Sequence, residues 1–181
     1  MRHALHALAA ALLSTGAAHA APQVQISPAA ATLLPGDELA FTITGSGFDT
    51  LTVGGGLSLQ WNPDVLDLAS VAVNTGDWEF ISSTGELDAA SGRLSNLFFN
   101  SFNGRQGSFS IATLRFVADQ PGSTALTLSG TELFPFVDVS ESVLTVQFTG
   151  ADITVTAVPE PSAALLLLGG LAGLAWRRRA G

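Results

Sequence analysis

Apolar and polar residues alternate with a period of two through most of residues 24–157, and this pattern limits the fold more than any other feature. In residues 37–44, Leu39, Phe41 and Ile43 fall on one face of an extended strand and the residues between them on the other. No stretch of the region keeps the 3.6-residue period of a helix. The same alternation recurs in residues 57–61, 71–73, 94–99, 109–118, 126–129, 143–148 and 153–157. The sequence therefore predicts an all-β fold.

Turn signals separate these segments. Pro35-Gly36 and Pro121-Gly122 each precede an alternating segment, and in a type II turn the glycine of such a pair takes a positive φ. Strands that follow one another at short intervals, without helices between them, favour a two-sheet antiparallel sandwich. Residues 21–157 are enough to bury a core of their own, so we expect one domain here.

The first 20 residues have the pattern of a secretory signal peptide. Arg2 precedes an apolar core rich in alanine and leucine, and the segment ends in Ala18-His19-Ala20. The pattern predicts cleavage after Ala20, which leaves Ala21 as the first residue of the mature protein. The alternative is an uncleaved membrane anchor. Both interpretations place residues 21–157 outside the cytoplasm.

The final segment, residues 158–181, combines a proline-rich triplet, an apolar run over 163–176 and a cluster of arginines. The triplet is Pro159, Glu160 and Pro161, and the arginines are Arg177, Arg178 and Arg179. As a helix the run would reach about 21 Å, which is short for a hydrocarbon core of about 30 Å. We expect a short transmembrane helix that holds the chain transiently, with the arginines on the cytoplasmic side. A buried helix of a soluble domain is the alternative, but the run has no polar face.

This order of elements resembles the PEP-CTERM sorting signal of envelope proteins in Gram-negative bacteria. The resemblance implies that an exosortase-type membrane enzyme recognises and cuts the tail. It also implies transient residence in the inner membrane, followed by transfer to the outer cell surface or the extracellular matrix.

The composition excludes most kinds of enzyme chemistry. The chain has no Cys, Lys or Tyr, and its histidines, His3, His6 and His19, all lie in the signal peptide. Thiolate nucleophiles, Schiff-base lysines, histidine triads and histidine-based zinc sites are therefore absent from residues 21–157. These residues contain 14 acidic and three basic side chains, a formal net charge of 3 − 14 = −11. Such a surface repels phosphates, so we expect no nucleic-acid partner.

Three segments share a further pattern. Residues 35–41 read Pro-Gly-Asp-Glu-Leu-Ala-Phe, and residues 55–66 place an apolar strand before Trp-Asn-Pro-Asp and Val-Leu. Residues 107–116 contain Ala-Thr-Leu-Arg-Phe, and Pro-Gly-Ser-Thr follows at 121–124. In this order they resemble cohesin-like domains, jelly-roll sandwiches that include the scaffold modules of cellulosomes and are related to carbohydrate-binding modules. The resemblance implies the jelly-roll fold but identifies no binding residues.

The candidate binding surface is aromatic. Alternation puts Phe98 and Phe99 on opposite faces, so one of them is a candidate for exposure next to several asparagines. The candidate residues are Phe98, Phe99, Asn100, Phe102 and Asn103, together with Trp78 between two acidic residues. Exposed rings and amides suit stacking on a sugar or contact with a protein. The alternative is that the aromatic side chains fill the core.

The carboxylates leave two alternatives open. Asp64 with Asp67, and Asp138 with Glu141, are pairs that would ligate Ca²⁺ if loops brought them together, but none has EF-hand spacing. A glycosidase pair of carboxylates would come from distant strands and has no sequence signature. The glycines at 54–56 lack the Lys of a phosphate loop and favour a bulge or a flexible start of a strand.

These observations predict a non-enzymatic exported protein of the envelope or extracellular matrix, without a cofactor, whose sandwich binds a polysaccharide or a protein partner. The alternatives are a cohesin-type docking module without affinity for glycans and a carboxylate-based glycoside hydrolase.

Overall fold

The computed structural model describes residues 21–158, which form strands, turns and loops and contain no helix. Period-2 alternation therefore predicts the structural class correctly. The strands are β1 (Gln23–Ser27), β2 (Ala30–Leu33), β3 (Glu38–Gln60), β4 (Leu66–Val73), β5 (Ile81–Ser83), β6 (Glu86–Asp88), β7 (Arg93–Ala118), β8 (Gly122–Gly130), β9 (Val137–Asp138), β10 (Gln147–Thr149) and β11 (Ala151–Val155).

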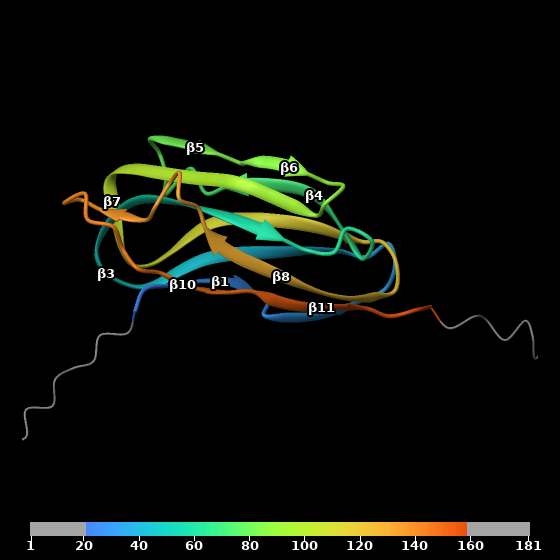
Figure 1. Cartoon of the computed structure of the whole chain (residues 1–181). Coiled ribbons are helices and arrows are strands. Elements are labelled where there is room, and N and C mark those ends of the chain that lie inside the picture. The colour runs from blue at the N-terminus through green and yellow to red at the C-terminus, as the bar shows by residue number, and fades with distance from the viewer. Residues whose placement is uncertain (1–20, 159–181) are drawn as a thin grey trace, which may run out of the picture.

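Two long strands, β3 and β7, organise the fold (Figure 1). They pair antiparallel from Glu38↔Val117 to Gln60↔Arg93, with several register shifts in the middle of the ladder. Bulges bend a strand and increase its twist. Each strand therefore contributes its two halves to different layers of the sandwich.

We call the two layers sheet I and sheet II. Sheet I has the order β10, β1, the first half of β3, the second half of β7, and β4. Sheet II has the order β2, β11, β8, the second half of β3 and the first half of β7, which also pairs with β5 and β6. The pairs are antiparallel except for β1 with β10 and β11 with β2, which are parallel. A network of hydrogen bonds thus continues through both layers.

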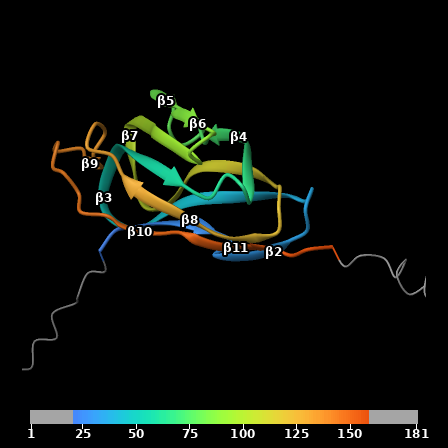
Figure 2. The ribbon, with the colours of Figure 1, turned by 45° about the vertical axis from the view of Figure 1, so that its right-hand side comes forward.

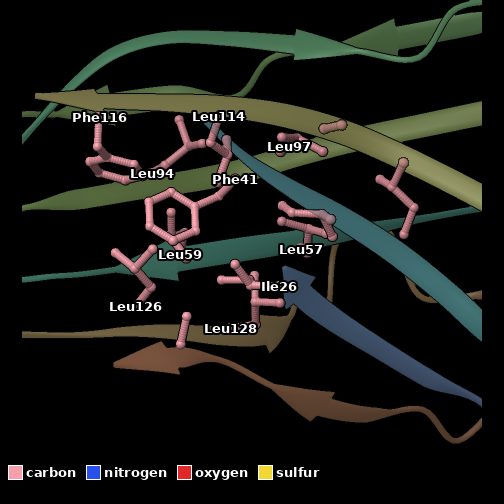
Figure 3. Packing of buried hydrophobic residues seen from close by; sticks show 14 of the residues in the cluster. Ile26, Phe41, Leu57, Leu59, Leu94, Leu97, Leu114, Phe116, Leu126 and Leu128 are labelled. Atoms are coloured by element: carbon pink, nitrogen blue, oxygen red, sulfur yellow. The ribbon is translucent and has the colours of Figure 1, made fainter. Parts of the chain in front are cut away.

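The core lies between the layers, where side chains from both halves of β3 and β7 meet (Figure 3). Phe41 from the first half of β3 and Leu59 from its second half are both almost fully buried. Phe41 also packs edge-to-face against Phe116, with ring centroids 6.0 Å apart. The expected inward face of residues 37–44 is confirmed for Phe41 and Ile43, whereas Leu39 at the start of the strand is only partly buried.

Two local expectations turn out differently. Gly36 has a φ of 89° and lies in a turn closed by the Asp37 N–H and the Leu34 carbonyl, as expected. Gly122 does not have a positive φ, because it already belongs to β8 and pairs with Val155. The expected strand at 143–148 is mostly irregular and becomes a regular strand only as β10.

The predicted signal peptide and its cleavage residues Ala18 and Ala20 lie outside the described residues, as do the sorting triplet, the apolar run and the arginines. Within residues 21–158 no helix is long and apolar enough to cross a membrane.

Candidate functional site

Aromatic side chains gather on the outer face of sheet II. Along the first half of β7, Phe98, Asn100 and Phe102 point away from the core, whereas Phe99 and Ser101 are buried. The expected opposite orientation of Phe98 and Phe99 is therefore confirmed. Phe98 and Asn100 lie between β5 and the second half of β3, and Phe102 follows them along β7.

Phe98 lines a largely apolar cavity of about 400 Å³ on this face, which we call the apolar hollow. Its ring stacks on Phe134, with centroids 4.3 Å apart and an angle of 25° between the planes. Ile81 and Leu133, which also line the hollow, are 53% and 69% exposed. The remaining lining residues are Gly54, Gly55, Phe99, Asn100, Pro135 and Val137.

The three glycines of β3 allow the loop of residues 131–137 to pack on both faces of the strand. A Cβ on Gly55 would lie 2.6 Å from the buried ring of Phe136. A Cβ on Gly56 would lie 2.7 Å from Cβ of Phe134, on the opposite face. The ladder with β7 also shifts register between Thr52 and Gly54, so the glycines lie at an irregularity within β3 and not at the start of a strand. Gly54 and Gly55 line the apolar hollow, and the absence of side chains there makes room for this loop.

A second aromatic pair is formed by Phe80, just before β5, and Phe102 of β7. The ring centroids are 4.0 Å apart, and the side chains are 53% and 70% exposed. Large apolar side chains exposed next to one another are typical of contact surfaces. Figure 2 shows β5 and the first half of β7 on the side of the molecule opposite β1 and β10.

A polar network holds residues 77–79, which precede Phe80, against β7, which carries Phe102. Glu79 Oε1 accepts hydrogen bonds from Ser101 Oγ at 3.0 Å and from Asn103 Nδ2 at 3.1 Å. Arg105 Nε donates to Asp77 Oδ1 at 3.3 Å, and its Nη2 lies 3.8 Å from Glu79 Oε2. A hydrogen bond from its own backbone N–H, assisted by the bonds from Ser101 and Asn103 and the charge of Arg105, lowers the pKa of Glu79. The ionised carboxylate therefore ties the segment before β5 to β7.

We expect the network to open in acid. Because the folded-state pKa of Glu79 is lowered, its stabilising contribution is complete at neutral pH and is lost as the pH falls through that folded pKa. An NMR titration should show the side-chain amide of Asn103 shifting with a midpoint below the ordinary glutamate value of 4.5. The shift should disappear in Glu79→Gln. A midpoint above 4.5 would contradict this account.

Two of the candidate surface residues, Trp78 and Phe99, lie in the core, which is the alternative considered for the aromatic side chains. Trp78 is 1% exposed, and its Nε1 donates to the Ser110 carbonyl at 2.9 Å. Its ring packs against Phe99 and Phe109, with centroids 4.5 Å and 5.0 Å away. A turn in which the Trp78 N–H donates to the Asn74 carbonyl directs the indole inward. Trp78 is therefore no part of an exposed binding surface, and Phe99, which is 1% exposed, takes part only as a lining residue of the apolar hollow. Phe98, Asn100, Phe102 and Asn103 remain candidates.

The suggested calcium ligands gain no support from the geometry. Asp138 is buried, and its Oδ1 accepts hydrogen bonds from the N–H groups of Ser140 and Ser142 at 2.8 Å and 3.0 Å. Its carboxylate therefore organises the loop that contains Glu141. Across residues 21–158, no three acidic side chains are grouped closely enough to hold a metal ion.

A polar cavity of about 490 Å³ adjoins the apolar hollow, and Leu133 lines both. We call it the polar hollow. It is lined by Ser58, Arg93, Ser95, Asn96, Ser129, Gly130, Thr131, Glu132 and Leu133. Arg93 Nε donates to Ser95 Oγ at 3.0 Å. The outer face of sheet II thus has an apolar part and a polar part. Of the residues that line the polar part, the sequence pointed only to Asn96, one of the asparagines near the candidate aromatic side chains.

The comparisons with known proteins agree with both parts of the sequence interpretation. Residues 157–179 match the PEP-CTERM protein-sorting motif. No curated protein matches the chain significantly. The match to the sorting motif indicates an exported protein that is processed at the membrane.

Solved structures of cohesins share the fold. The sixth cohesin of Acetivibrio cellulolyticus scaffoldin B, solved with a dockerin, is 15% identical with a TM-score of 0.61, over 75% of this chain and 99% of that one. A cohesin from Clostridium acetobutylicum is 16% identical with a TM-score of 0.56, over 75% and 91%. The cohesin module of a Clostridium perfringens family 33 glycoside hydrolase is 8% identical with a TM-score of 0.60, over 76% and 97%. The described domain is a cohesin-like β-sandwich.

Proposed function

We propose that this protein is a non-enzymatic component of the cell surface or extracellular matrix, sorted by an exosortase-type enzyme, whose sandwich docks a protein partner on the outer face of sheet II. The observation that carries the docking proposal is the apolar hollow. Its rim residues Ile81 and Leu133 are more than half exposed, although a folded domain gains by burying such side chains. A partner that covered these two side chains would likewise gain free energy from removing them from water.

The shape of the site supports a protein partner. The hollow is lined by aromatic and aliphatic side chains, with stacked rings of Phe98 and Phe134, and such anchored apolar pockets are typical centres of protein interfaces. The polar hollow beside it supplies the hydrogen-bonding rim that such interfaces have. Similar sandwiches have been solved in complex with dockerins, which shows that a protein of this fold can present a docking surface.

Binding of a polysaccharide is the second candidate, and the polar hollow favours it. Hydroxyl groups of Ser58 and Ser129, the amide of Asn96 and the guanidinium of Arg93 line one cavity. These groups donate and accept hydrogen bonds as sugar hydroxyls require. The exposed rings of Phe80 and Phe102 lie further along the same sheet.

Substitution in the apolar hollow tests the docking proposal. Full-length protein and the double variant Ile81→Glu, Leu133→Glu would be used to recover partners from envelope extracts. Because the new charges would be buried unpaired in the interface, the variant should bind the recovered partner at least about 100-fold more weakly. Its melting temperature should not change, since both side chains are exposed.

Leu87→Glu is the matched control, because Leu87 is 51% exposed in β6 but lines neither hollow. A partner that binds the double variant as well as the wild type contradicts docking at this face. A glycan array with the same proteins separates the two candidates. Because Leu133 lines both hollows, the single variant Ile81→Glu is used for this comparison. A glycan signal that survives Ile81→Glu and is lost in Arg93→Ala would favour the polysaccharide.

A further inference from the structure

The end of the sandwich at which the described chain leaves the fold is a rigid surface. Backbone hydrogen bonds tie its loops together: Gly36 N–H to the Ala118 carbonyl at 2.8 Å, and Asp119 N–H to the Val65 carbonyl at 2.9 Å. In both ribbon views the chain enters at the opposite end and leaves here, beyond β11 (Figures 1 and 2). We call this surface the exit end, formed by residues 33–37, 61–66, 118–122 and 156–158.

The chain is held firmly up to Thr156. β11 lies between β2 and β8, and its side chains Ile153 and Val155 are 1% and 2% exposed. Beyond it, Thr156 N–H donates to the Leu33 carbonyl at 2.9 Å. Releasing β11 would break ladders on both sides and expose core side chains, so this strand does not fray as an edge strand would.

Only Ala157 and Val158 separate Thr156 from Pro159. Three residues of fully extended chain span at most about 11 Å. An enzyme that takes Pro159 to Pro161 into its active site must therefore approach within about that distance of the folded sandwich. The parts of the enzyme that surround its active site are therefore held next to this end of the sandwich.

We propose that the exit end is a docking surface for the membrane processing enzyme, which presents the sorting motif at a fixed distance. This inference rests on the proposed sorting function. Leu34, 45% exposed in the turn of the exit end, and the exposed Val158 offer it apolar contacts. The exit end contains Asp37, Asp64 and Asp119 but no Lys or Arg. It therefore lacks the basic side chains that attract lipid headgroups, which disfavours the bilayer surface as the occupant.

A spacer insertion tests the proposal. Ten Gly/Ser residues would be inserted between Val158 and Pro159 of the full chain, and processing would be followed by pulse-chase in cells that contain the processing enzyme. A longer flexible tether lowers the effective concentration of the motif at a docked enzyme, so we expect processing to slow about tenfold. A rate equal to or above that of the wild type would overturn the proposal, because a sandwich that merely obstructs the enzyme would be relieved by the spacer.

A matched pair of substitutions tests the surface itself. Leu34→Glu should slow processing at least about fivefold, because it places an unpaired carboxylate in the contact. Leu51 is 42% exposed in the middle of β3, where the strand bends at the opposite end of the sandwich. Leu51→Glu should therefore leave the processing rate unchanged. Equal effects of the two substitutions would overturn the proposal. If the wild-type chain is never cut, the sorting proposal is wrong as well. If the wild-type chain is cut and the spacer variant is cut at the same rate, only this inference is wrong.

Discussion

Replacing Trp78 by alanine is expected to lower the free energy of unfolding by about 3–5 kcal/mol. The indole is buried between Phe99 and Phe109, and its Nε1 donates to the Ser110 carbonyl. The substitution therefore leaves a large cavity and an unpaired backbone acceptor. Because a domain of this size is stable by roughly 5–15 kcal/mol, the loss should be obvious in urea denaturation followed by circular dichroism.

Phe102→Ala provides the contrast. Phe102 is also aromatic, but it is 70% exposed and its ring packs against that of Phe80. Its replacement by alanine should therefore lower the free energy of unfolding by no more than about 1 kcal/mol. Similar losses for the two variants would show that Trp78 is not the core residue described above.

Gly54→Ala is expected to destabilise the fold by about 2–3 kcal/mol. A Cβ at this position would lie 2.5 Å from the Phe99 carbonyl oxygen and 2.8 Å from Asn100 Nδ2. A backbone oxygen cannot rotate away as the end of a long side chain can, so β3 and β7 would have to move apart. Thermal unfolding of the variant measures this cost. The substitution should also reduce partner binding at the apolar hollow, because Gly54 lines it.

Gly76→Ala is the control for a methyl group added to a glycine. The nearest atom to its Cβ would be Asn74 Oδ1 at 3.3 Å, the end of a side chain. We expect a change within about 0.5 kcal/mol, as for most surface substitutions. A loss at Gly54 no larger than that at Gly76 would contradict the close approach of the two strands.

The sequence could predict the fold because alternation is a local signal. Phe41 and Ile43 lie two residues apart, and their side chains must share a face in any extended strand. The continuity of β3 through Thr52 and Gly54 was not predictable, because its bulges arise from pairing with the distant β7. The parallel pairing of β11 with β2 likewise depends on residues far apart in the chain.

The binding surface was predictable only in part, for the same reason. Alternation separates Phe98 from Phe99 correctly, but it does not show that residues 131–137 return to cover the glycines of β3. Phe134 therefore could not be identified as a site residue from the sequence, although its ring stacks on that of Phe98. Trp78 was misplaced because its acidic neighbours suggest exposure, whereas a turn closed by Asn74 carries the indole into the core.

Intact-mass measurement of the membrane-bound and released forms shows whether this chain is exported and cut within its sorting tail, as we propose. We expect a released form that begins at Ala21 and lacks Arg177, Arg178 and Arg179. A mature protein that keeps these arginines and stays in the inner membrane would contradict this proposal.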